Sequence, residues 1–182
     1  MNDETRPIQG TALHPEGDLG LAARILVQER IRGIRKSVDR RLAPGDIVIH
    51  PASADVRAHL FEEACELYWN ELSWEEITEE ELVGDDELTE MVFAGLLTLI
   101  DAFLPRAANG EPDRSREHRD VAHDFLTWLA AQLIELGSKT PDSDDDRQRI
   151  YRRKNVTDDL IDLIAFRVCG LTEAEIETYQ SH

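Results

Sequence analysis

Carboxylates at helical spacing are the first side chains in this chain that could do chemistry. His59, Glu63 and Glu66 follow one another at intervals of four and three residues, so one face of a helix would carry all three. Glu87 and Glu90 repeat the three-residue interval further along the chain. Magnesium binds a few carboxylates together with phosphate and water. Candidate magnesium ligands are therefore Glu63, Glu66, Glu87 and Glu90.

This pattern resembles the acidic pairs that hold magnesium in all-α nucleotide pyrophosphatases, which implies a Mg-dependent pyrophosphohydrolase as one alternative function. The Glu-x-x-Asp partner that accompanies those pairs occurs in this chain only downstream, at Glu117 and Asp120. Residues 59–104 hold 14 Asp and Glu and no Lys or Arg, so such intervals are also expected by chance. A solvated acidic face is the simpler interpretation, and we expect no cofactor.

A His-Asp pair at His123 and Asp124 offers a second route to metal chemistry. The pair is similar to the metal-binding dyad of His-Asp-type phosphohydrolases, which need a further upstream His and a downstream Asp. His59 and Asp162 could serve as those two ligands. The dipeptide is short and lies among charged residues, so we expect an exposed or capping histidine here.

Basic side chains gather in two runs of an otherwise acidic chain. The formal net charge is -18, which argues against nucleic-acid binding over the whole surface but allows local contacts. Each basic residue would supply one phosphate contact at most. The candidate contacts to a partner or to nucleic acid are Arg35, Lys36 and Arg40 in the first run and Arg147, Arg149, Arg152, Arg153 and Lys154 in the second.

The acidic middle of the chain supports a further function class. Carboxylates at fixed helical spacing can copy the phosphate array of duplex DNA and occupy the cleft of a DNA-binding enzyme, as phage anti-restriction proteins do. Salt adaptation produces the same composition, and the excess of Arg over Lys, 17 to 3, suits a salt-adapted host or a GC-rich genome. An acidic DNA-mimic inhibitor is therefore an alternative function.

Hydrophobic periodicity predicts the helices that must position these side chains. Apolar residues recur every three or four residues over about 21–42, 53–72, 73–83, 88–104, 115–136 and 147–169, the last as one helix or two, and a short helix follows to about residue 180. Ile47–Ile49 is a short extended run without a second strand to pair with. We predict an all-α fold, a single bundle of about six to eight helices with no significant sheet.

Local signals mark the ends of several predicted helices. Ser73 and Thr172 each precede a Glu by three residues, which predicts two capping boxes. Ser115 is the expected N-cap of the helix over 115–136, and Gly137 and Gly170 are expected C-caps. Helical spacing places Trp128 with Phe125 and Leu129, so we expect its ring in the core.

Domain organisation and location follow from the same features. Residues 1–18 contain two Pro and two Gly and no apolar period, which predicts a flexible N-terminal arm before one all-helical domain over 19–182. Residues 115–182 form the helical tail of that domain. The longest apolar run, Met91 to Leu104, is too short for a membrane span. The polar N-terminus shows no signal peptide, and the two unpatterned cysteines suit a reducing compartment, so we expect a cytoplasmic protein.

The tail carries the one stretch that resembles a known family. Ile134-Glu135-Leu136 precedes a polar stretch, and Thr157-Asp158-Asp159-Leu160-Ile161-Asp162-Leu163-Ile164 leads on to Gly170-Leu171-Thr172-Glu173-Ala174-Glu175-Ile176. Residues 133–177 thus resemble the C-terminal helical tail of adenine-specific DNA methyltransferases and single-chain restriction–modification enzymes. Phe166, Val168 and Cys169 depart from that family's pattern, which has Tyr, Leu and Tyr at these places.

The resemblance implies a supporting piece rather than a methyltransferase. The chain has no Asn-Pro-Pro-Tyr motif and no cofactor-binding Gly loop, so no catalytic residue carries over. We therefore predict a non-catalytic helical protein that binds a macromolecular partner in DNA restriction or phage defence. A protein partner is expected, with DNA reached through that partner or through the basic runs. A homo-oligomer is a further option, and no membrane is involved.

Overall fold

A computed structural model describes residues 14–38, 42, 51–73 and 85–181 of the chain, without the side chains of residues 85–88. The fold of these residues is all-α, as predicted. The helices are α1 (Gly17–Lys36), α2 (Ala54–Leu72), α4 (Asp85–Val92), α5 (Ala94–Phe103), α6 (Arg119–Ser138), α7 (Asp144–Cys169) and α8 (Glu173–Gln180). The described residues form no strand, and their β-type pairing is limited to an isolated bridge between Arg106 and Pro112. None of the described helices is both long and apolar enough to cross a membrane.

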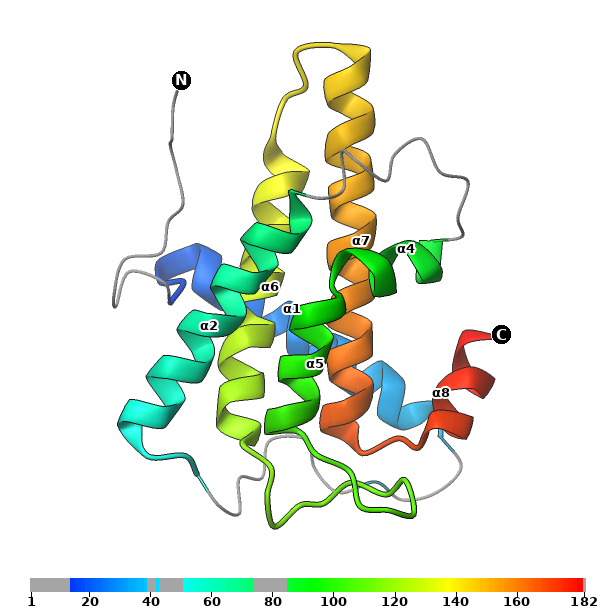
Figure 1. The fold of residues 1–182 in the computed structure, drawn as a ribbon. Helices are drawn as coiled ribbons and strands as arrows, with labels where there is room; N and C mark the ends of the chain where they lie inside the picture. Colours follow the sequence, from blue (N-terminus) through cyan, green and yellow to red (C-terminus); the bar gives the residue numbers. More distant parts are fainter. Residues whose placement is uncertain (1–13, 39–41, 43–50, 74–84, 182) are drawn as a thin grey trace.

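An antiparallel hairpin of α6 and α7 forms the centre of the bundle (Figure 1). Helix α1 crosses behind both of these helices and packs on each of them. Helix α2 packs on α6 and on α5, and α4 packs on α7. The end of the hairpin where α6 runs into α7 extends beyond the neighbouring helices, at the top of Figure 1.

Aromatic side chains from α2, from α6 and from the break between α4 and α5 meet in the main core. Trp128 of α6 is 2% exposed, which confirms the core position predicted for it. Its ring contacts the ring of Tyr68 edge to face at 5.1 Å, and Tyr68 stacks on Phe93 at 5.7 Å. The Tyr68 hydroxyl is satisfied by a 3.0 Å hydrogen bond with the hydroxyl of Thr157 of α7. A buried hydrogen bond therefore joins α2 to α7 within the core.

A second, smaller cluster holds α8 against the bundle. Ile34 of α1, Phe166 of α7 and Ile176 of α8 are all buried in it. Two predicted caps set the sharp turn between α7 and α8, and both are confirmed. Gly170 ends α7 with φ of 80°, the left-handed conformation that glycine adopts most readily. Thr172 and Glu175 form the predicted capping box.

The structure corrects two predicted helix starts. The helix predicted over 115–136 begins only at Arg119, because the Ser115 hydroxyl donates to Asp113 instead of capping a helix. The backbone N–H of His118 donates to the Phe103 carbonyl at 2.7 Å, which fixes the start of α6 against the end of α5. Gly137 lies within α6, which continues to Ser138. The basic stretch and the apolar stretch predicted as one helix or two form a single helix, which starts at Asp144.

Two further boundaries differ, one for a local reason and one for a tertiary reason. The helix predicted over 21–42 spans Gly17–Lys36, and Ser37 closes it by donating to the Ile34 carbonyl at 2.7 Å. The helix predicted over 88–104 breaks at Phe93 into α4 and α5. The carboxylate of Glu71 accepts from the N–H groups of the first two residues after Ala94, at 2.7 and 2.9 Å, and so caps α5 from α2.

Some predictions fall outside the described residues. These are the extended run Ile47–Ile49, the helix over 73–83 with Glu76 of its capping box, and nearly all of the N-terminal arm. Ser73 itself is the C-cap of α2, and its hydroxyl donates to the Asn70 carbonyl at 2.6 Å.

Candidate partner-binding surface

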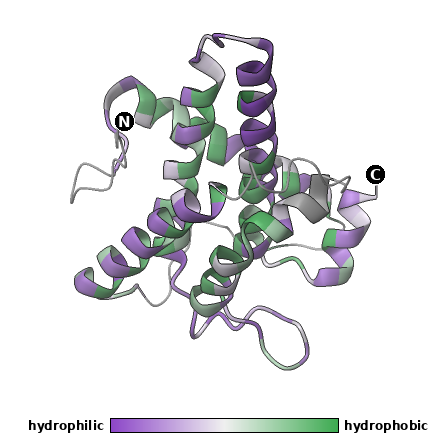
Figure 2. Ribbon diagram, turned by 45° about the horizontal axis from the view of Figure 1, so that its top comes forward, coloured by the Kyte–Doolittle hydropathy of each residue, from purple (hydrophilic) through white to green (hydrophobic). Residues whose placement is uncertain are grey.

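The first turns of α7 place a basic segment at the projecting end of the hairpin. Ser143 caps the helix by accepting from the N–H of Asp146 at 3.1 Å. Aspartates occupy the first turn, where negative charge is favoured by the helix dipole. The basic residues 147–154 follow directly, and this end of α7 is the most continuously hydrophilic stretch in Figure 2.

The five predicted contacts on α7 do not all face solvent. Arg147 has a side chain that is 70% exposed and lies 3.3 Å from Asp144, while Arg149 is also exposed. Arg152 is half-buried. Lys154 lies against α6, with its ammonium nitrogen 3.8 Å from the place a Cβ would take at Gly137.

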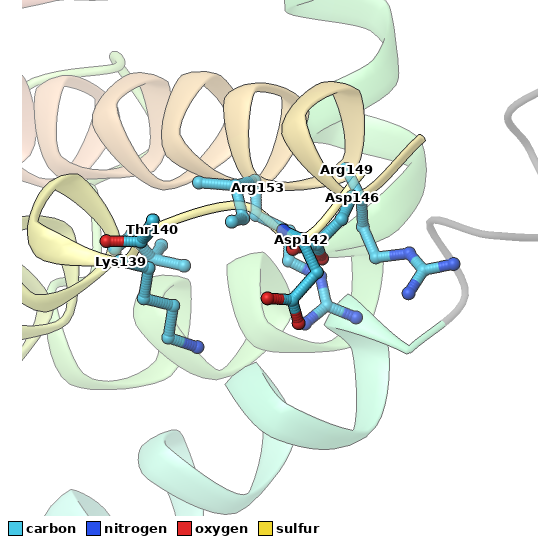
Figure 3. A pocket seen from close by; sticks show the side chains of 8 residues that line it. Lys139, Thr140, Asp142, Asp146, Arg149 and Arg153 are labelled. Atoms are coloured by element: carbon cyan, nitrogen blue, oxygen red, sulfur yellow. Dashed lines mark hydrogen bonds between the residues drawn. The ribbon is translucent and has the colours of Figure 1, made fainter. Parts of the chain in front are cut away.

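Arg153 faces a hollow of about 290 Å³ between the end of α6 and the start of α7 (Figure 3). Its lining carries both charges, since Lys139 and Arg149 share it with Asp142 and Asp146. Asp146 accepts from the backbone N–H of Asp142 at 2.9 Å. In Figure 3 Lys139 and Arg149 extend in different directions, with Asp142 between them. The cations therefore do not converge on one point in the hollow.

An aromatic side chain that sequence reasoning missed lies among these basic residues. Tyr151 is 66% exposed, the largest exposure among the bulky hydrophobic side chains of the described residues. Helical spacing places it on the outward side of α7, next to Gln148 and Arg152. The sequence signal that could have identified it is a tyrosine within a basic run at a position outside the apolar spacing of the helix. We call Arg147, Gln148, Tyr151 and Arg152 the hairpin surface; Arg149 lines the hollow on the other side of the helix.

The first basic run lies far from the hairpin surface. Arg35 and Lys36 are exposed in the last turn of α1, where cations are favoured by the helix dipole. Arg35 donates to the Leu42 carbonyl at 3.3 Å. This end of α1 packs with α8 and the last turns of α7, at the opposite end of α7 from the hairpin surface (Figure 1). Arg40 is outside the described residues.

The candidate magnesium ligands are not assembled by the described part of the fold. On α2, Glu63 lies 3.7 Å from His59, and Glu66 is exposed. Glu90 of α4 instead lines a hollow with Asp159 of α7. The side chain of Glu87 is outside the description. Among the described residues, no group of three or more His, Cys, Asp or Glu is placed to hold a metal ion.

Both aspartates of the candidate His-Asp centre, Asp124 and Asp162, join helices through ion pairs. Asp124 of α6 binds the guanidinium of Arg57 of α2 through two hydrogen bonds of 2.6 and 2.8 Å. Asp162 of α7 accepts from Arg30 of α1 at 2.7 Å, and Arg30 also donates to Asp158 at 2.7 Å. Burial raises the pKa of Asp162, and Arg30 offsets only part of that rise. These residues therefore position helices.

The two cysteines, Cys65 and Cys169, are buried thiols. Burial raises the pKa of both, and that of Cys169 to about 11. A thiol with a raised pKa holds its proton at neutral pH, so neither group is an activated nucleophile.

Comparison with known proteins identifies no family for this chain. Protein-family models, curated proteins and solved structures all lack a significant match to the chain.

Proposed function

We propose that this chain is a non-catalytic partner-binding protein that docks through the hairpin surface, and that it works on DNA in restriction or phage defence. The observation that carries the proposal is the position of the hairpin surface. Exposed Arg147, Gln148 and Tyr151 stand at the projecting end of one continuous helix of a chain with net charge -18.

The composition of the hairpin surface suits macromolecular binding. Arg and Tyr are enriched among the residues that dominate binding energy at interfaces. Arginine also matches phosphate with its planar fork of donors. Tyr151 supplies apolar area with few rotatable bonds, so little entropy is lost when its ring is covered.

The acidity of the remaining chain gives such docking a direction. A phosphate backbone is attracted by the arginines of α7 and repelled by the carboxylates of the acidic middle of the chain, so an approach along α7 is favoured over an approach along that acidic stretch. The aspartates at the very tip of the hairpin oppose an end-on approach. DNA would therefore lie along the side of α7 that carries Tyr151 and Arg152. The resemblance of residues 133–177 to methyltransferase tails points to the same setting.

Binding of labelled duplex DNA to the full chain tests the proposal. We expect an affinity that falls steeply between about 50 mM and about 200 mM salt, because each phosphate contact releases counterions. The variant Arg147→Ala with Arg152→Ala should weaken binding at low salt by about tenfold. It should also reduce the slope of log affinity against log salt concentration by about two. Fluorescence anisotropy of the labelled duplex measures both quantities.

A charge-matched control separates a local site from general electrostatics. Arg32 and Arg116 are exposed arginines outside the hairpin surface, so Arg32→Ala with Arg116→Ala changes the net charge equally. This control should bind DNA as the parent chain does. Equal loss in the two double variants, or no DNA binding at low salt, contradicts the proposal.

The two alternative functions predict other outcomes. An acidic DNA mimic binds no DNA but competes with DNA for a methylase or nuclease. Most of the acidic side chains that would form the mimic lie outside the described residues. A pyrophosphohydrolase releases pyrophosphate from nucleotides with magnesium, and Glu66→Ala abolishes that release.

A further inference from the structure

A half-buried arginine, Arg106, in the loop between α5 and α6 has hydrogen-bond partners on only one side of its guanidinium. The backbone of this loop closes on itself, since Ala107 donates to the Glu111 carbonyl at 2.8 Å and Arg106 bridges to Pro112. The Arg106 side chain is only 15% exposed. Its Nη1 donates to the Gly110 carbonyl at 3.1 Å. One corner of the guanidinium is thus fixed by the loop that carries it.

The opposite edge of the same guanidinium is unsatisfied. Nε and Nη2 of Arg106 are buried and have no hydrogen-bond partner among the described residues. The Oε1 atom of Glu173 lies 3.5 Å from Nη2 as an ion-pair contact. Burying a donor without a hydrogen bond costs free energy, and the cost is greater for a charged group.

Arg57 shows what this edge does when it is occupied. Its Nε and Nη2 bind the two carboxylate oxygens of Asp124 at 2.6 and 2.8 Å, although the side chain of Arg57 is 46% exposed. These two parallel N–H groups match any planar or tetrahedral oxyanion. Arg106, whose side chain is less exposed than that of Arg57, therefore presents the same fork without a hydrogen-bonded carboxylate.

A second guanidinium converges on the same point. Arg167 of α7 pairs with Asp101, and its Nη2 lies 3.6 Å from the Glu173 oxygen that Arg106 faces. Burial and the neighbouring charge of Arg167 lower the pKa of Arg106, while Glu173, Asp101 and Glu111 act in the opposite direction. One carboxylate oxygen at ion-pair distance is thus shared by two cations. The Glu173 side chain that carries it is 65% exposed.

We propose that Arg106 and Arg167 form a binding site for a phosphate group, and that the Glu173 carboxylate is its displaceable internal occupant. A phosphate has enough oxygens to bond the Nε/Nη2 edge of Arg106 and Nη2 of Arg167 together. Glu173 can turn outward because it is exposed and makes no hydrogen bond to either arginine. Asp101 and Glu111 remain nearby, so the affinity is on the order of millimolar.

Titration of the full chain with inorganic phosphate at constant ionic strength tests the site. The NMR signal of the Arg106 Nε–H, which is buried, reports on the fork directly. We expect a saturable shift in the parent chain and an affinity about tenfold higher in Glu173→Gln, because the competing carboxylate is gone. Arg106→Lys keeps the charge but lacks the fork, so titration monitored through the backbone amides of the loop should show no saturable response.

Additional titrations and control variants identify the source of the phosphate and keep the test decisive if one variant fails to fold. Phosphoserine replaces phosphate in a parallel titration; binding of both indicates a phosphorylated partner group, and binding of phosphate alone indicates the free ion. Arg32→Gln is the control for nonspecific charge and should behave as the parent chain. Equal affinity of parent and Glu173→Gln, or no saturable shift in either, overturns the proposal. Glu173 is exposed, so this variant decides the question even if Arg106→Lys fails to fold.

Discussion

The two halves of α7 have opposite surroundings within one uninterrupted helix. From Val156 to Cys169 the helix lies in both hydrophobic clusters, and Leu160, Ile161 and Ile164 have no exposed surface. From Asp144 to Asn155 no residue is fully buried. We call these the inner half and the outer half.

The difference shows how a helix can present a surface that the core does not need. Helices in proteins are stabilised mostly by the packing of an apolar face. The inner half supplies that packing, and the outer half continues from it with a Ser143 cap and a local contact between Asp144 and Arg147. The exposed side chains of the outer half are therefore not needed for core packing and are available to bind a partner. Three measurements can sharpen or break this contrast.

Truncation of the inner core should have the largest effect. Leu160→Ala removes a fully buried side chain, and we expect the free energy of unfolding to fall by about 2–5 kcal/mol. Gln148→Ala in the outer half should change it by less than about 0.5 kcal/mol. Urea unfolding followed by circular dichroism measures both. Comparable losses would show that the outer half is part of the core.

Loss of the cap at the inner end of α7 should lower the free energy of unfolding more than loss of the cap at the outer end. Gly170→Ala forces a side chain into φ of 80° and sets its Cβ 3.1 Å from the Arg114 guanidinium, so we expect a loss of about 1–3 kcal/mol. Ser143→Ala removes one hydrogen bond at the exposed end and should cost about 0.5–1 kcal/mol. Thermal unfolding ranks the two variants, and the reverse ranking would contradict the contrast.

The smallest effect concerns a buried carboxyl beside the inner half. Glu117 is 4% exposed and lies 3.6 Å from Arg119, which donates to the Val168 carbonyl. Burial raises the pKa of Glu117 above its ordinary 4.5, with Arg119 opposing the rise. The folded state therefore binds more protons than the unfolded state in the interval above pH 4.5. The free energy of unfolding contributed by this group falls as pH rises through that interval.

Glu117→Gln should reduce the total fall in the free energy of unfolding over this pH interval by on the order of 1 kcal/mol or less. Urea unfolding at a series of pH values from about 4 to 7 measures the slope in the parent chain and in the variant. Asp142→Asn alters an exposed carboxyl in the loop just before the outer half and should keep the parent slope. An unchanged slope in Glu117→Gln would mean that the carboxyl is charged in both states.

Local signals made the helical fold predictable from the sequence. Apolar spacing identified the helices and the buried position of Trp128, and the short patterns at Gly170 and Thr172 located the turn before α8. The break at Phe93 could not be predicted, because the group that caps α5 is a carboxylate from another helix, Glu71. Its contribution depends on tertiary packing alone.

The location of the candidate surface along the chain was predictable, but which of its side chains face solvent was not. The basic run at 147–154 could be seen in the sequence, whereas its division between solvent and α6 depends on the rotation of α7 in the bundle. Lys154 and Arg153 turn toward α6, and Tyr151 turns outward. The pairing of Arg57 with Asp124 spans 67 residues, so no local pattern could separate that carboxylate from a metal ligand.

Arg30 has a geometric consequence for the far end of α7. Its guanidinium holds Asp158 and Asp162, which are one helical turn apart, so α7 can neither slide along α1 nor turn about its own axis without losing a bond. Because α7 is one continuous helix, its rotation about its axis is the same at both ends. The direction in which Tyr151 and Arg152 point is therefore fixed by the ion pairs of Arg30 about two turns away. Arg30 lies on α1, a helix that does not itself form the hairpin end.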